Sequence, residues 1–510
     1  MYRQLVAERG PRKGVNDAVA VVLFDKQPTL PAGYVALDKQ LGGALSEVRK
    51  RKELELGRGS MTVVHPRQGA ARLYVLGLGE RGKLDTGESL RIAAAKLPGP
   101  MSRAGITGLR AEIAPGLGDA LGDEAAGRAF ADGLAIGNFE FKAFKGKATQ
   151  NSRNGKPSPE ASRLSVAIDA PMRKGLGRGL SIAESVNLAR HLAATPPNVA
   201  NPGHLVAFCR TMARQVGLTC KVIDAAQAKR LKMGGLLAVG AAGSTPPAII
   251  CLEWKGGARS KGRGPRAGGP VMFVGKAVTF DTGGYSIKPA VGMESMKYDK
   301  CGGMAVIGAM HAIARLKLPG HVVGLIPTAE NLINDRGYRP SDILTMTNGV
   351  TVEVTNTDAE GRLILGDALA YGCKTYKPRA IVDLATLTGG VVTALGSQGA
   401  GAFCGDPTLR SHLFDAAEFT GERLWHLPLW EEHKALIKSN HADIVNSGGR
   451  EAHPIQGAVF LWHFIDPATT PWAHLDIAGV SDTKDSHALY GKGPTGFGVR
   501  LLTRAVETWK

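Results

Sequence analysis

The sequence has few cysteines and no long apolar segment. Its six cysteines are scattered over 510 residues, and no two of them form a C-x-x-C pair. This spacing argues against a disulfide framework or a structural zinc site and favours reduced thiols in the cytoplasm. Uninterrupted apolar stretches, such as residues 18–24, are far too short to span a bilayer, so we expect no membrane partner. The first residues also lack an apolar run followed by a small-residue cleavage site, so we expect no signal peptide.

Acidic residues are scarce relative to basic ones. The chain has 63 Lys and Arg against 45 Asp and Glu, a net charge of +18. Residues 1–180 hold 29 of these cations against 18 acids, an excess of 11, and five further cations lie in the Gly-rich stretch 255–266, which contains no acid. Such an excess can attract nucleic acid. A generally basic proteome, or a need for solubility, explains it more simply.

The N-terminal part predicts a small α/β domain. Apolar runs at 18–24, 72–79 and 164–170 are typical of buried strands, and the patterns of 88–97 and 123–141 are typical of helices. The polar stretch 145–163 contains breakers and predicts a linker or an excursion. A helix is expected from about Ser181 until Pro196 and Pro197 stop it.

The C-terminal part alternates strand-like and helix-like segments, which favours a largely parallel sheet with helices on both faces. Its strand candidates are 247–254, 271–278, 322–329, 351–356, 380–387 and 473–479, and helical stretches such as 302–317 and 362–376 separate several of them. The prediction is an α/β chain with a smaller N-terminal domain (1–170), a linker helix region (171–190) and a larger C-terminal domain (191–510).

Ligands of such sheets gather at the carboxyl ends of the strands, which here means after residues 276, 356 and 387. Four acids near these ends would repel one another unless cations neutralised them, and two divalent ions supply +4. Ligation by oxygen without His or Cys fits Mg, Mn or Zn. The candidate residues are Lys276, Asp281, Lys288, Asp299, Asp358, Glu360 and Arg362.

Local backbone features favour convergence of these groups. Gly283 and Gly284 permit a tight turn after Asp281. Asp358 and Glu360 are two residues apart, so in extended chain their side chains point the same way. Arg362 then opens a helix, whose N-terminus favours anions.

Each residue also has an ordinary structural explanation. Asp281 could cap a turn and Asp299 could cap a helix. Lys288 could be an exposed loop residue, and Arg362 could pair with Asp367.

The segment NTDAEGRL (356–363) resembles the signature of the leucyl aminopeptidase, or cytosol aminopeptidase, family. The resemblance covers roughly residues 185–505, while the first 170 residues match only in general character. An eight-residue match with ordered companions is highly specific. The companions are VGKAVTFDTGG (274–284), SIKP (286–289), MKYD (296–299), LARHLAATPPN (188–198), YRPSDILTMTNG (338–349), ATLTGGVVTALG (385–396) and GPTGFGVR (493–500).

The resemblance implies a role for each candidate. Lys276 would be a metal ligand through a neutral amine. Asp281 and Glu360 would bridge two ions, Asp299 would complete the tighter site and Asp358 the more exchangeable one. Lys288 would stabilise the developing oxyanion, and Arg362 would hold a bicarbonate that acts as general base.

The family resemblance also implies the reaction. Two divalent ions, Mn or Zn and possibly Mg, would activate a bridging water that attacks the first peptide bond of peptides with a free α-amine, with a preference for Leu-like residues. It also implies a cytoplasmic homohexamer. The pocket for the first side chain would be lined by Met293, Met296, Thr386, Leu387 and Gly389.

The sequence departs from the family pattern at Ala277, Tyr285 and Lys300, none of them a proposed ligand, and in a longer basic insert between Trp254 and Pro270. These departures bear on loop shape and substrate preference. Two other functions stay open: nucleic-acid binding through the basic N-terminal part, and another hydrolysis at the same metals, such as dipeptide or phosphoester cleavage.

Overall fold

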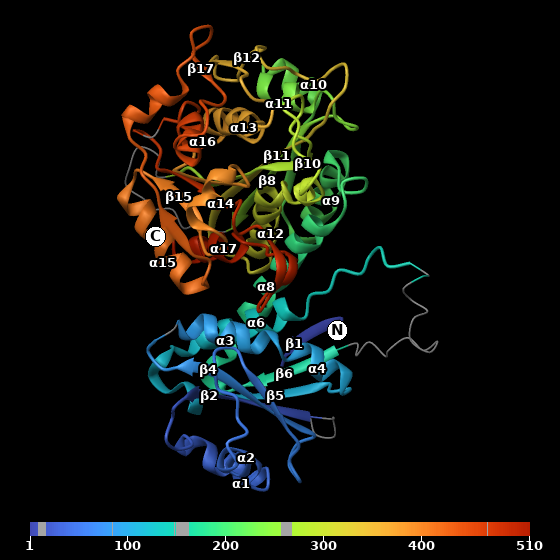
Figure 1. The fold of residues 1–510 in the computed structure, drawn as a ribbon, viewed down its shortest axis with the longest axis vertical. Coiled ribbons are helices and arrows are strands. Elements are labelled where there is room, and N and C mark those ends of the chain that lie inside the picture. The colour runs from blue at the N-terminus through green and yellow to red at the C-terminus, as the bar shows by residue number, and fades with distance from the viewer. Residues whose placement is uncertain are drawn as a thin grey trace. The chain divides into compact units, whose positions relative to one another are not determined.

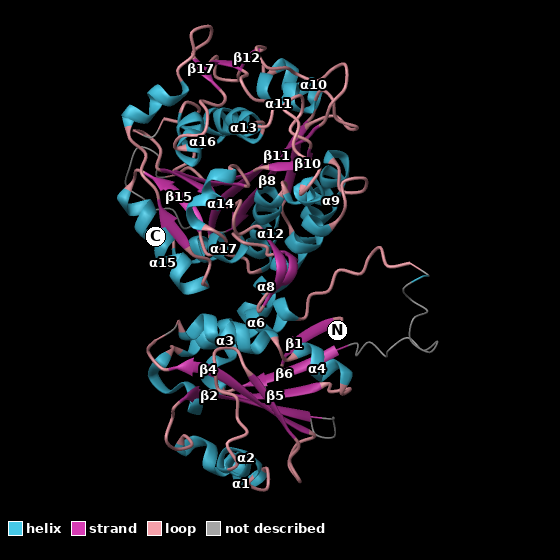
Figure 2. Ribbon diagram, in the orientation of Figure 1, coloured by secondary structure: helices cyan, strands magenta, loops and turns pink. Residues whose placement is uncertain are grey.

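A computed structural model describes residues 1–8, 17–83, 85–146, 148, 163–256, 268–466 and 468–509. The chain divides into two compact units, one of residues 1–187 with 485–492 and the other of residues 188–484 with 493–510 (Figure 1). Most of the predicted linker 145–163 and of the basic stretch 255–266 lies outside the described residues. Each unit mixes helices and strands, as predicted (Figure 2).

The first unit is built on a six-stranded sheet, parallel except for its β3–β4 edge. Its strands are, in sheet order, β1 (Gln4–Ala7), β6 (Arg163–Ile168), β5 (Gly108–Glu112), β2 (Asp17–Asp25), β4 (Arg72–Glu80) and β3 (Met61–Val64). Its helices are α1 (Val35–Gln40), α2 (Ala44–Lys50), α3 (Thr86–Ala95), α4 (Pro98–Arg103), α5 (Ala114–Leu117) and α6 (Asp123–Gly137). The next helix, α8 (Arg173–Ala194), begins several residues before the predicted Ser181 and continues into the second unit.

The second unit contains the larger sheet, whose central strands β18, β14, β9 and β11 are mutually parallel. Strand β9 is apolar throughout, strand β14 is apolar except for Asp383, and both are buried, as expected for parallel strands covered on both faces. The sheet order is β16 (Leu424–His426), β15 (Ala400–Cys404), β18 (Trp472–Asp476), β14 (Ala380–Ala385), β9 (Val271–Gly275), β11 (Gly320–Asn331), β8 (Ala248–Gly256) and β7 (Thr219–Ile223), with β10 (Ala277–Asp281) paired to β11.

Helices cover both faces of this sheet (Figure 1). Helix α12 packs on one face together with α9 and α17, and α13 packs on the other with α11 and α16. Among the helices that the structure describes, none has the length and apolar content needed to cross a membrane. The helices of this unit are α9 (Pro202–Val216), α10 (Ala225–Arg230), α11 (Gly234–Gly240), α12 (Cys301–Arg315), α13 (Gly361–Tyr376), α14 (Gly389–Leu395), α15 (Pro407–Thr420), α16 (His453–Trp462) and α17 (Val499–Thr508).

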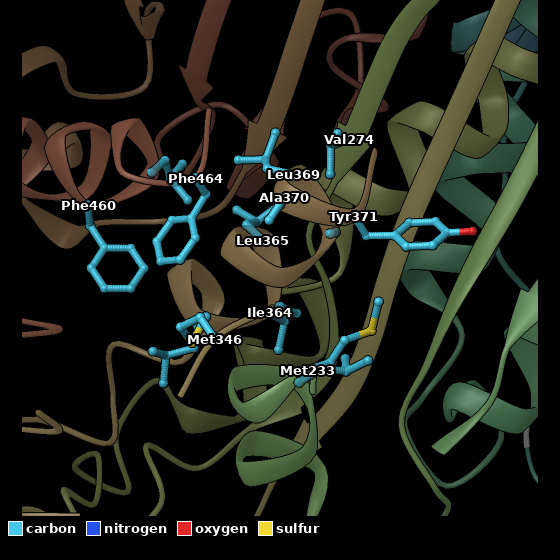
Figure 3. Packing of buried hydrophobic residues seen from close by; sticks show 14 of the residues in the cluster. Met233, Val274, Met346, Ile364, Leu365, Leu369, Ala370, Tyr371, Phe460 and Phe464 are labelled. Carbon is cyan, nitrogen blue, oxygen red and sulfur yellow. The ribbon is translucent and has the colours of Figure 1, made fainter. Parts of the chain in front are cut away.

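Helix α13 is buried over most of its length, so its position is fixed by packing on all sides. Ile364, Leu365 and Leu369 are fully buried. Met233, at the N-cap of α11, and Phe460 of α16 lie around them in the same hydrophobic cluster (Figure 3). Close packing of this kind resists displacement, because every shift opens voids or clashes. Packing of α13 therefore also fixes the position of its N-terminus, where Glu360 and Arg362 lie.

One predicted strand belongs elsewhere. Residues 351–356 were expected to contribute to the large sheet, but β13 (Thr351–Glu353) lies in a separate three-stranded sheet between β12 (Ile343–Thr345) and β17 (Ile444–Val445). The strand is short and half buried, and periodicity alone cannot assign such a segment to a sheet. The remaining strands, β19 (Asp482–His487) and β20 (Gly491–Pro494), form a two-stranded sheet.

Asp367 of α13 ties this helix to two neighbouring segments. Its Oδ2 accepts a hydrogen bond from the Leu236 N–H (2.9 Å) and its Oδ1 from the Thr347 N–H (2.9 Å). The side chain is fully buried, and burial raises the pKa of Asp367 to about 6. The alternative pairing of Asp367 with Arg362 is therefore wrong, because both carboxylate oxygens face backbone donors.

We expect Asp367→Ala to lower the free energy of unfolding by about 2–4 kcal/mol, because two buried N–H groups lose their acceptor. Urea denaturation at pH 7.5 measures the change. Asp415→Ala, at an exposed position of α15, is the matched control and should change the stability by less than about 0.5 kcal/mol. Equal losses in the two variants would contradict this role of Asp367.

Candidate metal centre

Several candidate residues lie at the carboxyl edge of the central parallel strands. Lys276 directly follows β9, Asp281 ends β10, and Thr386 directly follows β14. Because β9 and β14 are parallel neighbours, their carboxyl ends meet at the same edge. The strand ends near residues 276 and 387, which were chosen from the sequence, therefore lie side by side at one edge of the sheet.

Lys276 lies at the centre of a buried ion-pair cluster. Its Nζ lies 2.8 Å from Asp299 Oδ1 and 2.8 Å from Glu360 Oε1, and it donates to the Thr386 carbonyl at 2.8 Å. All three charged side chains are less than one-tenth exposed. Asp299 also accepts a hydrogen bond from the Thr386 hydroxyl (2.8 Å), so both of these groups are held by the loop after β14.

Lys288 holds the second part of the cluster. Its Nζ lies 2.9 Å from Asp281 Oδ2 and also pairs with Asp358 Oδ1. The Lys288 side chain is 20% exposed, so it is partly accessible to solvent, while its partner Asp281 is buried. It is therefore not the freely exposed loop lysine of the alternative interpretation.

The turn after Asp281 uses glycine as predicted. Gly283 and Gly284 have φ of +85° and +63°, which only glycine adopts without strain. The Gly283 N–H donates to Asp281 Oδ1 (2.9 Å), so Asp281 does cap a turn while its other oxygen faces Lys288. Asp299 does not cap α12, whose N-cap is Lys300 without a side-chain hydrogen bond.

Asp358 and Glu360 come together for a different reason from the predicted one. The extended-chain argument is wrong, because Asp358 lies in a turn and Glu360 has helical dihedrals as the N-cap of α13. One carboxylate oxygen from each of Asp281, Asp358 and Glu360 nevertheless lies within 4.8 Å of the others. No other group of three His, Cys, Asp or Glu side chains meets this condition in the part of the chain that the structure describes.

The cluster is short of positive charge. Four carboxylates face two ammonium groups, which leaves a formal surplus of two negative charges. Burial raises the pKa of Asp299 and of Asp358, and repulsion from Glu360 adds to both shifts. Burial opposes the charge of Lys276 and Lys288, but the surrounding carboxylates outweigh it and raise both pKa values.

These residues fit divalent cations. Asp299 Oδ2 is buried and has no hydrogen-bond partner among the described residues. A buried carboxylate oxygen without a partner is costly, and a metal ion removes that cost. The all-oxygen donors of the acids, with one lysine amine, suit hard or borderline divalent ions.

Arg362, in the first turn of α13 after Glu360, is suited to binding an oxyanion. Its Nη1 donates to the Asn446 carbonyl (2.7 Å), while its buried Nε has no hydrogen-bond partner among the described residues. Burial lowers the pKa of Arg362 to about 10, so the group keeps its charge near neutral pH. A buried cation with an unused donor edge is suited to a carboxylate-like or bicarbonate-like anion.

The residues predicted to line a substrate pocket are partly brought to the site. Met293 and Met296 lie on the 3-10 helix Met293–Tyr298 just before Asp299, and both are half buried. Thr386 contacts the metal-site residues directly, whereas Leu387 is half buried and Gly389 exposed at the start of α14. Their role in substrate binding stays a prediction.

Sequence reasoning missed three buried polar residues that support the site. Asn331, at the end of β11, donates to Asp281 Oδ1 (2.8 Å), and the strand-end rule applied to β11 could have found it. Asp476, at the end of β18, accepts from the Leu387 N–H (3.1 Å) and the Thr388 hydroxyl (2.6 Å), and the same rule applies. Asn446 carries no comparable signal in the sequence.

In comparisons with known proteins, both units of the chain match descriptions of one protein family. The family description "Cytosol aminopeptidase family, catalytic domain" matches residues 187–503, and the N-terminal domain of that family matches residues 20–148. A "Probable cytosol aminopeptidase" of Solibacter usitatus is 41% identical over 99% of this chain and 100% of its own length. A protein of the same name from Geobacter sulfurreducens is 38% identical, with 96% of each chain covered.

Solved structures agree in fold. The bottromycin maturation enzyme BotP, in complex with Mn, superposes with a TM-score of 0.81 at 30% identity, covering 96% of this chain and 99% of its own.

The position of the Lys276 side chain depends on the absence of a side chain at residue 361. A Cβ built on Gly361 would lie 2.5 Å from Lys276 Cε and 2.7 Å from its Nζ. We expect Gly361→Ala to displace Lys276 and to weaken Mn²⁺ binding at least about 10-fold in titration calorimetry. Gly177→Ala is the control, because the space at that position of α8 is open. Unchanged Mn²⁺ affinity in Gly361→Ala would show that Lys276 does not shape the site.

Proposed function

Because the chain belongs to the cytosol aminopeptidase family and is thus a metallo-aminopeptidase, we propose that residues 276–362 hold two divalent ions and release the N-terminal residue of peptides with a free α-amine. The observation that carries this proposal is the buried cluster of four carboxylates and two lysines with its negative surplus and its unpartnered Asp299 oxygen. The chemistry is assigned to the C-terminal domain (191–510), which follows the N-terminal domain (1–170) and the linker helix region (171–190).

The metal ligands in this proposal are Lys276, Asp281, Asp299, Asp358 and Glu360. Asp281 and Glu360 would be shared between the ions, Asp299 and Lys276 would complete the tighter site, and Asp358 would complete the more exchangeable one. Lys276 acts as a neutral amine, which a bound cation can maintain. The two ions, Mn or Zn and possibly Mg, supply Lewis acidity that makes a bridging water nucleophilic at neutral pH.

The two remaining cations act on the substrate and on the proton. Lys288, which is partly accessible to solvent, donates to the carbonyl oxygen of the scissile bond as negative charge develops there. Arg362 would hold a bicarbonate through its unused Nε edge, and that anion would serve as the general base for the attacking water. The proton would then be returned to the leaving amine as the C–N bond breaks.

The preference for Leu-like first residues rests on the pocket residues Met293, Met296, Thr386, Leu387 and Gly389. Methionine side chains adapt to aliphatic groups of different shape. Tyr285, where the family usually has a smaller residue, is 46% exposed and donates to the Asn334 carbonyl (3.0 Å) beside the turn that precedes Lys288. A homohexamer in the cytoplasm is part of the proposal and rests on the family resemblance.

Hydrolysis of leucyl anilide by the Mn-, Zn- or Mg-loaded protein tests the reaction. We expect activity on the free amine, none on N-acetyl-leucyl anilide, and a loss of at least about 100-fold in Asp358→Ala, because that carboxylate is one of few ligands to the exchangeable ion. Asp415→Ala is the control and should keep wild-type activity. Cleavage of a phosphoester but not of the anilide, or full activity in Asp358→Ala, would overturn the proposal.

A second candidate function is nucleic-acid binding by the N-terminal part. The excess of 11 positive charges in residues 1–180 favours it, and Lys50, Arg51 and Lys52 at the end of α2 are exposed. Binding of this electrostatic kind should weaken by about 10³-fold or more between 50 and 200 mM salt in a gel-shift assay if six or more phosphates are contacted. Binding that does not weaken with salt would exclude this mode.

A further inference from the structure

Asn446 connects the three-stranded sheet of β12, β13 and β17 to the segment that carries Asp358, Glu360 and Arg362. It directly follows β17, its side chain is fully buried, and its N–H donates to the Glu353 carbonyl at 3.0 Å. It is 84 residues from Arg362 in the sequence. Because its side-chain amide is fully buried, Asn446 does not contact substrate. Its role must come from the residues that it hydrogen-bonds.

The Asn446 side chain uses both of its polar atoms on one loop. Its Oδ1 accepts hydrogen bonds from the Thr355 N–H (2.9 Å), the Thr355 hydroxyl (3.2 Å) and the Asn356 N–H (3.2 Å). Its Nδ2 donates to the Asn356 carbonyl (2.6 Å) and, more weakly, to the Ala359 carbonyl (3.5 Å). A single amide therefore fixes the backbone on both sides of Asp358.

The backbone carbonyl of Asn446 fixes Arg362 as well. It accepts from Arg362 Nη1 at 2.7 Å, while Arg362 Nε stays without a partner among the described residues. A guanidinium is planar, so a bond at one nitrogen sets the direction of the others. The contact with Asn446 thus decides which edge of Arg362 is left for an anion.

The loop needs such a residue because no regular structure holds it. Residues 354–360 lie between β13 and α13, and Asp358 lies in a turn there. The Thr357 carbonyl is held from the other side by Asn331 Nδ2 (3.0 Å) and the Tyr338 hydroxyl (2.7 Å). From the β17 side the loop is held by Asn446 and by the Ser447 carbonyl, which accepts from the Thr355 hydroxyl at 2.6 Å. Of Asn331, Tyr338 and Asn446, only Asn446 reaches both the loop and Arg362.

We propose that Asn446 is a positioning residue of the reaction, which sets the Asp358 and Glu360 carboxylates for metal binding and turns Arg362 toward its anion. This inference rests on the proposed two-metal function. It concerns a residue that touches neither metal nor substrate. Its loss should therefore weaken metal binding and turnover while leaving substrate recognition largely intact.

The test compares Asn446→Ala and Asn446→Asp with the wild type. Asn446→Asp keeps the size and the acceptor but loses both Nδ2 donors, so it remains informative if the alanine variant does not fold. In each variant we expect Mn²⁺ affinity, measured by titration calorimetry, to fall about 10–100-fold. At saturating Mn²⁺, kcat on leucyl anilide should still fall about 10-fold, while KM changes less than about 2-fold. The reason is that the Asn446 backbone, whose carbonyl holds Arg362, loses the side-chain hydrogen bonds that tie it to residues 355–359.

Asn138→Ala is the matched control. Asn138 clamps the Tyr2 backbone through two hydrogen bonds (3.0 and 2.8 Å) in the first unit, so its loss should lower stability without changing Mn²⁺ affinity or kcat. An Asn446→Asp variant that loses stability like Asn138→Ala but keeps wild-type Mn²⁺ affinity and kcat would overturn the inference. If wild-type protein binds Mn²⁺ but cleaves no peptide, the proposed function fails while the affinity comparison still tests the metal-positioning role of Asn446.

Discussion

The repulsion among four carboxylates in one mostly buried cluster is the constraint on which the rest of the site depends. Asp281, Asp299, Asp358 and Glu360 cannot be held together in a low-dielectric interior without compensating charge. Lys276 and Lys288 offset two of these four charges, and the other two favour a divalent ion. With Lys276 as a neutral ligand, as proposed, a third negative charge is left for a second ion. The surrounding fold must therefore hold like charges close to one another, which requires rigid support from several directions.

That support comes from two kinds of structure. The ends of the parallel strands β9, β10 and β14 place Lys276, Asp281 and the Thr386 loop, because their backbones are fixed by the sheet. The segment with Asp358 has no strand of the large sheet behind it and is fixed by buried side-chain amides and by the packed helix α13. Hydrogen bonds from buried amides give such loops a single conformation, since leaving those amides unpaired would be costly.

Site residues at the ends of strands could be predicted from the sequence, whereas the conformation of the loop before α13 could not. Lys276 and Asp281 were found from the sequence because they follow apolar runs, and the strand-end rule applies to them directly. The same rule placed Asp358 and Glu360 in extended backbone just past a strand of the large sheet. That is wrong, because β13 belongs to a separate sheet and Glu360 has helical dihedrals. The six-residue pattern of 351–356 is too short to distinguish a central strand from an accessory one.

By itself, the sequence determined the chemical character of this protein: an α/β chain in which acids and lysines follow strand ends, with motifs specific enough to indicate the cytosol aminopeptidase family. Those properties are local, because side-chain chemistry and short-range spacing are written along the chain. Only the tertiary structure decided that Asp299 meets Lys276, that Arg362 turns its Nη1 to Asn446, and that Asp476 holds the loop after β14. These contacts join residues 23 to 89 positions apart, and long-range packing that no local pattern encodes brings them together.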